Sequence, residues 1–420
     1  MGRGGRTAAL ALATLIGTGG SRPQAGWVLS WASSQQVPET QNALTPDDLT
    51  DATLRETVPL SAGGRRLRVR LSNVFGTRPL ALSSVHVALA ASAGAPTIRA
   101  GTDRGLTFAG RAGATLPAGG ETWSDSVTLD APSLSDLAVS LHFDQPPRGQ
   151  TGHPGSRTTS WLVHGDRASA PDLSDGRKVQ HWFQLSGVEV ETSGRPRAGI
   201  VTLGDSITDG RGSTTDGDDR WPDQLARRLQ RTPDLKAVGV ANAGIGGNRL
   251  LADGLGPSAL ARLDRDVLSE PGARVLILLE AINDLGVLGR DHPSDQAREV
   301  QLRQLEDAYA HIIADAHAHR LKVMGGTLLP DGGTQTYPTT PADEAARQRL
   351  NAWIRTPGRF DAVADFDAAL RDPAQPDRLR ADLDSGDHLH PSPAGYRVMA
   401  EAVPLDLLKR WIAVRPWRLR

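Results

Sequence analysis

The sequence contains no cysteine in 420 residues, which excludes disulfide bonds and a cysteine nucleophile. It is also poor in lysine, which occurs only at positions 178, 236, 322 and 409. The formal net charge is −1, and this balance gives no sign of a nucleic-acid partner or of binding to an anionic membrane. Beyond the first 25 residues, no apolar run is long enough to cross a bilayer. We therefore expect no nucleic-acid partner, no membrane insertion of the processed chain, and a monomer.

The first 25 residues have the pattern of a secretory signal peptide. Arg3 and Arg6 precede an apolar run from Thr7 to Ile16, which is too short to span a membrane. Small residues follow, and Ala25-Gly26 is a candidate cleavage region. The alternative is an uncleaved amphipathic N-terminus. We predict a signal peptide over residues 1–25 and a secreted or periplasmic protein.

A period of two dominates residues 27–192 and predicts strands. Apolar and polar residues alternate in several runs, at 67–71, 85–89 and 137–143. Clusters of Gly, Pro, Ser and Asp separate these runs, as expected for turns. The pattern predicts an N-terminal β-sandwich or jelly-roll domain over 27–192, with its last strand at 188–191. The following segment, 193–197, is expected to be a linker.

Beyond this linker, short apolar runs alternate with amphipathic helical patterns, which is typical of a parallel sheet covered by helices. Strands are expected at 200–203, 238–241, 275–279, 322–328 and 362–366. Helices are expected to begin at Trp221-Pro222, to run through 302–316, and to close the domain from Ser392-Pro393 through Val403. The predicted fold class is therefore α/β, with a doubly wound, flavodoxin-like parallel sheet over 198–415 that follows the β domain.

Blocks of polar and small residues follow the expected strands. Ser206 follows the first strand in a Gly-Asp-Ser turn, Gly247 follows the second, and Asn283 follows the third. Asp387 and His390 precede the last expected helix. Ligands of such sheets bind outside the carboxyl ends of the strands, so we expect these residues to converge on one edge. Taken singly, each block has a plainer interpretation as a turn or a helix cap.

Together these residue types suit acyl transfer. A serine hydroxyl needs a base at neutral pH, and His390 is the candidate, with Asp387 to hold the imidazole and stabilise its charged form. His388 is the rival imidazole, but it neighbours Asp387 directly, so its side chain should point away. The backbone N–H groups of Ser206 and Gly247 and the side-chain amide of Asn283 are the candidate donors for an oxyanion.

At these blocks the chain resembles the SGNH/GDSL hydrolases, a family of serine esterases, lipases and related acyl hydrolases. The resemblance covers Ala198 to about Val403, and the family's four named residues fall on Ser206, Gly247, Asn283 and His390. The third block usually begins with glycine, whereas this chain has Ala281. The strings 246–251 and 384–391 resemble the exported bacterial branch with an N-terminal β domain, which includes relatives of xylan-associated esterases. This resemblance implies an SGNH hydrolase fold.

No cofactor and no metal are expected. His311, His317 and His319 lack the i, i+4 spacing that a helical metal site prefers, and a solvated helix face is the simpler interpretation. Asp216, Asp218 and Asp219 lack the downstream Gly and Glu of a calcium loop, and are expected to cap the helix at Trp221. The β-domain tryptophans are expected in the core, with a sugar-stacking platform as the alternative; they are Trp27, Trp31, Trp123, Trp161 and Trp182.

We therefore expect an exported serine esterase that hydrolyses short-chain acyl esters, acetyl above all, of a small molecule or a polysaccharide. One alternative is a lipase or an acyltransferase with the same triad. Another is a carbohydrate-binding protein with an idle hydrolase site, against which the intact set of blocks argues. The preference for acyl chain and for alcohol is expected to depend on loops such as 286–295 and 330–341.

Overall fold

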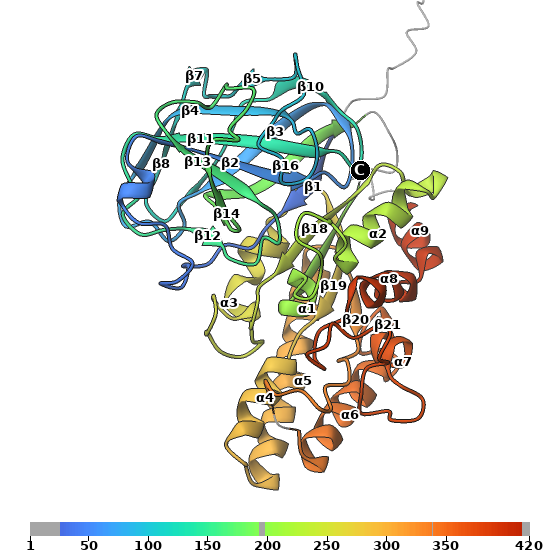
Figure 1. Ribbon diagram of the computed structural model, residues 1–420. Coiled ribbons are helices and arrows are strands. Elements are labelled where there is room, and N and C mark those ends of the chain that lie inside the picture. The colour runs from blue at the N-terminus through green and yellow to red at the C-terminus, as the bar shows by residue number, and fades with distance from the viewer. Residues whose placement is uncertain (1–25, 193–197, 338, 414–420) are drawn as a thin grey trace, which may run out of the picture.

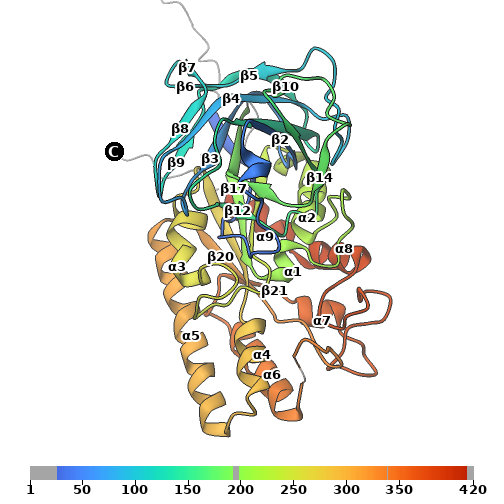
Figure 2. The same cartoon turned by 60° about the vertical axis from the view of Figure 1, so that its left-hand side comes forward.

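A computed structural model describes residues 26–192, 198–337 and 339–413, and shows a strand-rich domain beside an α/β domain (Figure 1, Figure 2). The predicted signal peptide and linker lie outside the described residues. Among the residues described, no helix is both long and apolar enough to cross a membrane.

The N-terminal domain is a sandwich of two antiparallel sheets. One sheet contains, in spatial order, β1 (Gly26–Ala32), β16 (Leu185–Thr192), β3 (Gly64–Ser72) and β10 (Val127–Ala131), with β9 (Glu121–Trp123) beside β3. The other contains β14 (Arg177–Val179), β13 (Ser160–His164), β2 (Ala52–Pro59), β11 (Asp136–Phe143), β4 (Leu80–Leu89) and β5 (Arg104–Gly105), with β8 (Ala114–Leu116) beside β4. Two short pairs complete it, β6 (Thr107–Phe108) with β7 (Arg111–Ala112) and β12 (Gly152–His153) with β15 (Trp182–Phe183), together with a 3-10 turn at Asp47–Leu49.

Burial of one face explains the period of two in these strands. Leu67, Val69 and Leu71 on β3 are fully buried in the sandwich core, as the alternation predicts. The arginine at position 70 does not follow this pattern. Arg70 is buried because its guanidinium pairs with Glu270 of the other domain, at 2.6 Å. The predicted β-sandwich is confirmed, and its last strand, β16, begins three residues earlier than expected, at Leu185 rather than 188.

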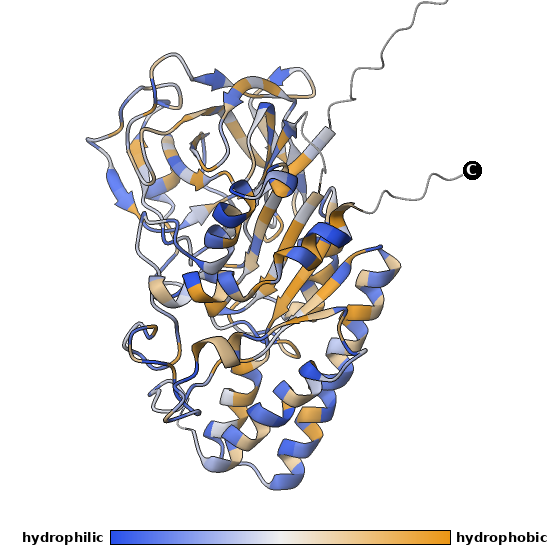
Figure 3. Cartoon of the chain, turned by 90° about the vertical axis from the view of Figure 1, so that its right-hand side faces the viewer, coloured by the Kyte–Doolittle hydropathy of each residue, from blue (hydrophilic) through white to orange (hydrophobic). Residues whose placement is uncertain are grey.

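The second domain is built on a five-stranded parallel sheet. Its spatial order is β18 (Val238–Gly244), β17 (Ala198–Gly204), β19 (Ala273–Leu279), β20 (Lys322–Gly326) and β21 (Ala362–Ala364). This 2-1-3-4-5 order is the flavodoxin-like order, so the predicted fold class is confirmed. Figure 3 shows the apolar strands lying between helices that are polar on their outer sides.

Helices cover both faces of this sheet. They are α1 (Ser206–Asp209), α2 (Trp221–Gln230), α3 (Ala259–Leu263), α4 (Ile282–Arg290), α5 (Asp295–Ala318), α6 (Pro341–Arg355), α7 (Phe366–Leu370), α8 (Pro393–Ala402) and α9 (Leu405–Ala413), with a 3-10 turn at Pro233–Leu235 and a π turn at Asp264–Leu268. The helix α2 packs on β18 and α8, whereas α5 packs on β20 and α6.

Three sequence-based expectations at element ends are wrong. The strand β20 ends at Gly326, two residues short of 328. The strand β21 ends at Ala364, because the carboxylate of Asp365 accepts a hydrogen bond from the N–H of Ala368 and starts α7. The helix at 393–402 is not the last one, since α9 begins after Pro404, whose ring is tolerated at a helix start. Trp411 lies in α9, and the rest of that basic tail lies outside the described residues.

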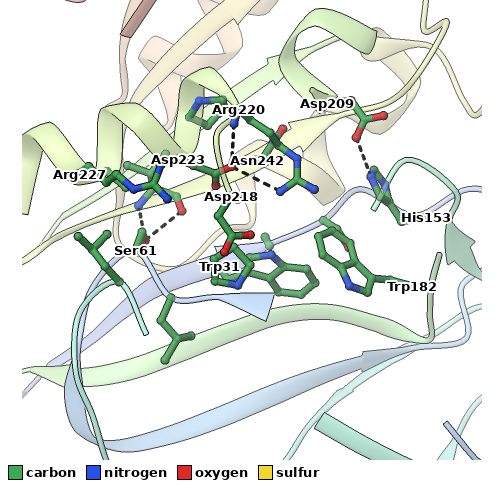
Figure 4. Close-up of a pocket in the computed structure, with 18 residues that line it drawn as sticks. Trp31, Ser61, His153, Trp182, Asp209, Asp218, Arg220, Asp223, Arg227 and Asn242 are labelled. Atoms are coloured by element: carbon green, nitrogen blue, oxygen red, sulfur yellow. Dashed lines mark hydrogen bonds and ion pairs between the residues drawn. The ribbon is translucent and has the colours of Figure 1, made fainter. Parts of the chain in front are cut away.

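The two domains share an extended contact in which β1 lies along β18. Gly239 of β18 lies so close to the carbonyl oxygen of Leu29 that an added Cβ would be 1.8 Å from it. The hydroxyl of Ser61 accepts a hydrogen bond from the N–H of Val240, at 2.8 Å. Figure 4 shows the small cavity, ≈ 50 Å³, that remains at this contact beside Trp31 and Trp182.

Candidate active site

Ser206 follows the carboxyl end of β17, the first strand of the domain, which lies between β18 and β19 in the sheet. Asp205 caps α1, and its side chain accepts a hydrogen bond from the N–H of Ile207 at 2.9 Å. Ser206 is therefore the first residue of a helix of four residues, which Gly210 ends with a φ of 107°. The hydroxyl stands at the positive end of this turn, and the residue is 7% exposed.

His390 connects Ser206 to Asp387. Its Nε2 lies 2.7 Å from Ser206 Oγ, and its Nδ1 lies 2.7 Å from Asp387 Oδ2. Partial burial would raise the pKa of Asp387, but the hydrogen bonds from the ring and the backbone N–H of His390 hold it well below its usual range. Asp387 is thus an anion that accepts a hydrogen bond from Nδ1–H. The neutral ring then has a free lone pair on Nε2 to accept the Ser206 proton.

His388 has a different partner. Its Nδ1 lies 2.6 Å from Asp384 Oδ2, and half of its side chain is exposed. The imidazole that reaches Ser206 is therefore that of His390. This agrees with the expectation that His388, the direct neighbour of Asp387 in the chain, points away from it.

Gly247 and Asn283 line the same cleft as Ser206 and His390. Gly247 has a φ of 70°, and a Cβ there would lie 2.7 Å from Leu255 Cδ1, so both conformation and space favour glycine. Asn283 lies in the first turn of α4. Ahead of it, Ala281 has a φ of 92°, in the left-handed region that glycine adopts without strain. The departure from the family's usual glycine therefore leaves the backbone shape in place at a conformational cost.

Tyr337 holds the amide of Asn283, a contact for which the sequence gives no signal. Its hydroxyl donates to Asn283 Oδ1 at 2.8 Å, while Asn283 Nδ2 donates to the carbonyl of Asn248 at 2.8 Å. These two bonds fix which end of the amide carries the N–H groups. One N–H of Nδ2 remains beyond the bond to Asn248.

Arg262 and Asp284 hold the turn that carries Gly247. The fully buried guanidinium of Arg262 donates to the carbonyl of Gly204 at 3.0 Å and to Asn248 Oδ1 at 2.8 Å. The carboxylate of Asp284 accepts from the N–H groups of Leu250 and Leu251, at 2.7 and 3.0 Å. Asp284 follows Asn283 directly in the sequence block, so its part in the site could have been predicted. Arg262 lies outside every such block, and the sequence gives no sign of its role.

Two buried carboxyls lie behind the serine. Burial raises the pKa of Asp205 to about 7. Burial also raises the pKa of Glu280 well above its usual range, and the neighbouring Asp205 raises it further. Glu280 is the last residue before Ala281, so the pair connects the Ser206 turn to the start of the Asn283 block.

Both domains form the walls of the cleft, whose volume is ≈ 750 Å³. The β domain contributes Gln36, Glu39, Gln41, Asn42, Pro154, Gly155, Arg157 and His181. Beside the cleft, Nε2 of His153 on β12 lies 2.8 Å from Asp209 Oδ1 on α1, as Figure 4 shows. The β domain therefore contacts the helix that carries Ser206.

The other histidines and aspartates that the sequence singles out form hydrogen bonds and ion pairs away from Ser206. His311 pairs with Asp315, and His317 pairs with Asp361. In the part of the chain that the structure describes, no group of three His, Cys, Asp or Glu side chains could hold a metal ion. The prediction that the aspartates at 216–219 cap α2 is wrong, because Asp216 accepts hydrogen bonds from Thr159 and the cap position is Arg220.

The tryptophans of the β domain do not line the cleft. Trp31, Trp161 and Trp182 are buried, in agreement with core packing. Trp27 and Trp123 both contact the Arg68 guanidinium, each with its ring centre 4.9 Å from the guanidinium carbon. None of these five rings therefore offers a surface for stacking a sugar in the cleft that holds Ser206.

A comparison with protein families matches residues 202–398 to the GDSL-like lipase/acylhydrolase family. The α/β domain belongs to that family. Membership makes this GDSL-like protein a serine ester hydrolase. A comparison with curated proteins gave no match.

Solved structures of the same kind resemble this GDSL-like chain at low identity. A GDSL-like lipase from Bacteroides thetaiotaomicron is 17% identical with a TM-score of 0.36, over 50% of this chain and 88% of that one. An acetyl xylan esterase from Geobacillus stearothermophilus is 22% identical with a TM-score of 0.37, over 53% and 97%. A lipase from a goat rumen metagenome is 16% identical with a TM-score of 0.40, over 51% and 98%.

Proposed function

We propose that this serine ester hydrolase is exported and removes short acyl groups, acetyl above all, from acylated carbohydrate. In this proposal Ser206 is the nucleophile, His390 the general base and Asp387 the carboxylate that orients the imidazole. The observation that carries the proposal is the continuous chain of hydrogen bonds from Ser206 Oγ through His390 to Asp387, with both links at 2.7 Å.

The reaction follows from this chain in two steps. His390 Nε2 takes the hydroxyl proton while Ser206 Oγ attacks the ester carbonyl, and the negative charge of Asp387 stabilises the imidazolium that forms. The N–H groups of Ser206 and Gly247 and the amide of Asn283 donate to the oxyanion. The alcohol leaves with the proton from His390, and a water molecule, activated by the same ring, then hydrolyses the acyl-enzyme.

The polar lining that the β domain contributes to the cleft favours a carbohydrate as the alcohol part of the ester. Amide side chains from the β domain, those of Gln36, Gln41 and Asn42, lie in the same cleft as Ser206. Amides donate and accept hydrogen bonds, as recognition of a hydroxyl-rich alcohol requires. A cleft of ≈ 750 Å³ also has room for more than one sugar ring beside a short acyl group.

Substitution of the proposed nucleophile tests the mechanism. Ser206→Ala should lower the turnover of a short-chain aryl ester by at least about a thousandfold while the protein stays folded. His390→Ala should be similarly inactive, and His388→Ala, which changes the exposed imidazole on the same turn, should keep most of the activity. A folded Ser206→Ala protein with most of its activity, or an inactive His388→Ala protein, would contradict the assignment.

The substrate is tested by kcat/KM. Acetate release from acetylated xylan or an acetylated monosaccharide should exceed hydrolysis of esters whose acyl chains have about eight or more carbons. Preference for the long chains would make the protein lipase-like. Transfer of the acyl group to an added alcohol in preference to water would make it an acyltransferase.

A further inference from the structure

A segment of the β domain, residues 154–159 between β12 and β13, reaches into the catalytic cleft and is held there by the other domain. Asp216 of the α/β domain donates its N–H to the carbonyl of Arg157 at 2.9 Å. Its carboxylate accepts from the N–H and the hydroxyl of Thr159, at 2.6 and 2.8 Å. Arg220 donates to the carbonyl of Ser156. Each contact crosses between the domains, so the segment has a fixed place beside Ser206.

Arg157 is the cationic residue of this segment, and its environment is unusual. Its backbone has a φ of 50°, a conformation that non-glycine residues seldom adopt and that tends to persist at functional sites. Its Nε is buried, yet among the described residues no acceptor bonds to this atom and the guanidinium forms no ion pair. A buried donor without an acceptor is costly. Arg157 as a whole is only partly buried and lines the cleft, so a ligand oxygen can reach the guanidinium from that side and offset this cost.

The charges around Arg157 favour an anion. Four arginines line the cleft, at positions 157, 211, 249 and 290, whereas the carboxylates that line it are Glu39 and Asp209. Asp209 pairs with His153, and Arg211 lies 3.8 Å from Asp387 of the triad. Among the described residues, the other three arginines have no carboxylate within ion-pair distance, so the charge of Glu39 balances at most one of them. Cationic charge is therefore in excess in a partly enclosed space, where its attraction for an anion is stronger than in open water.

We propose that Arg157 binds a carboxylate on the alcohol part of the substrate, so that the preferred substrate is an acyl ester of a uronic-acid-containing saccharide. The guanidinium offers two parallel N–H donors, which match the two oxygens of a carboxylate. The anion belongs to the alcohol part because an acetyl group has no place for a charge. This inference rests on the proposed esterase function and adds the charge of its substrate.

The test compares two substrates that differ only at C6, an acetylated methyl glucuronoside with a carboxylate there and the matching acetylated methyl glucoside with a neutral CH2OH group. For the unchanged protein, kcat/KM should be about tenfold higher for the glucuronoside at low ionic strength, and added salt should reduce this ratio. In Arg157→Gln the ratio should fall to about one. Arg157→Lys keeps the positive charge but loses the paired N–H donors of the guanidinium, so its ratio should lie between those of Arg157→Gln and the unchanged protein. Arg65→Gln removes an exposed arginine of the same domain that does not line the cleft, and should leave the ratio and the rates unchanged.

Three outcomes would overturn the proposal: no preference in the unchanged protein, an equal loss on both substrates in Arg157→Gln, or the same fall in Arg65→Gln. Should Arg157→Gln not fold, competitive inhibition of the unchanged protein decides instead. Methyl glucuronoside without the acetyl group should inhibit at lower concentration than methyl glucoside, and equal inhibition would refute the proposal. Hydrolysis of a neutral aryl acetate reports separately on the esterase itself, because failure of the charge preference leaves that activity intact.

Discussion

Two hydrogen bonds orient the side-chain amide of Asn283, one from the Tyr337 hydroxyl to Oδ1 and one from Nδ2 to the carbonyl of Asn248, both at 2.8 Å. Ser206, Gly247 and Asn283 follow consecutive strands of a parallel sheet, and the carboxyl ends of such strands meet at one edge, so their proximity could be predicted. Tyr337 lies in a loop without periodicity, 54 residues from the asparagine that it contacts. No local rule relates the two residues, so only the folded chain reveals this contact.

The Tyr337 hydroxyl should affect turnover through Asn283. We expect Tyr337→Phe to lower kcat about tenfold and to change KM less than about twofold, because the amide is less firmly held while the oxyanion forms. Steady-state kinetics with a short-chain aryl ester measures both constants. The double variant with Asn283→Ala is the control, since it should be no slower than Asn283→Ala alone. Additive losses would show that Tyr337 acts independently of Asn283.

Glu280 should make the protein less stable as the pH rises. Carboxyls of the unfolded chain titrate near pH 4, whereas burial raises the pKa of Glu280 well above its usual range and that of neighbouring Asp205 to about 7. The folded state therefore retains protons that the unfolded state has lost. The favourable contribution is complete below about pH 4 and is lost as the pH rises through the folded-state pKa values.

Glu280→Gln places a neutral side chain of the same shape at this position at every pH, so its part of the fall in stability with rising pH should disappear. We expect its melting temperature at pH 8 to exceed that of the unchanged protein by about 2–4 °C, the effect of about 1 kcal/mol in a large domain. At pH 4.5 the two proteins should differ less. Thermal unfolding at several pH values gives the comparison, and parallel curves for the two proteins would show that Glu280 does not titrate as argued.

At the scale of elements, long patterns were predictable and short ones were not. The helix α5 has 24 residues, and its apolar stripe identifies it in the sequence. The helix α1 has four residues, too few for any period, although it carries Ser206. Its position depends on β12 of the other domain, a strand of two residues whose pairing the sequence could not indicate.

The contact between His153 and Asp209 should stabilise both elements. Nδ1 of His153 lies 2.8 Å from the carbonyl of Ser34, so both ring nitrogens face an oxygen acceptor within a buried site. His153→Ala leaves Asp209 buried without its donor, and we expect a loss of about 3–5 kcal/mol in the free energy of unfolding, with lower kcat. Denaturant unfolding and kinetics measure these effects.

His86→Ala provides the matched control for His153→Ala. His86 pairs with Asp103 at 3.0 Å within the β domain, but both side chains are partly exposed. His86→Ala should lower the free energy of unfolding by about 0–1 kcal/mol and leave kcat unchanged. Equal losses in the two variants would show that burial of the His153 pair has no special effect.

At the scale of the whole molecule, the sequence predicts two domains but not how they meet. The seam joins residues far apart in the chain, such as Arg70 with Glu270 and Ser61 with Val240. Glu270 is buried, so this carboxyl lies inside the contact and not at its rim, and burial raises its pKa to about 7 against the opposing effect of Arg70. Because β1 packs along β18, we expect the two domains to unfold together in a single calorimetric transition.

Gly239 allows this close contact and is the position at which to disturb it. A Cβ at Gly239 would lie 1.8 Å from the carbonyl oxygen of Leu29, a backbone atom that cannot move without shifting β1. Gly239→Ala should therefore force the domains apart, lower the stability by about 1–3 kcal/mol or more, and divide the single transition into two. Gly199→Ala, on the neighbouring strand β17, is the control because its Cβ would approach no atom closer than 3.6 Å. Gly199→Ala should keep one transition near the original temperature, and a Gly239→Ala protein that does the same would show that the seam does not couple the two domains.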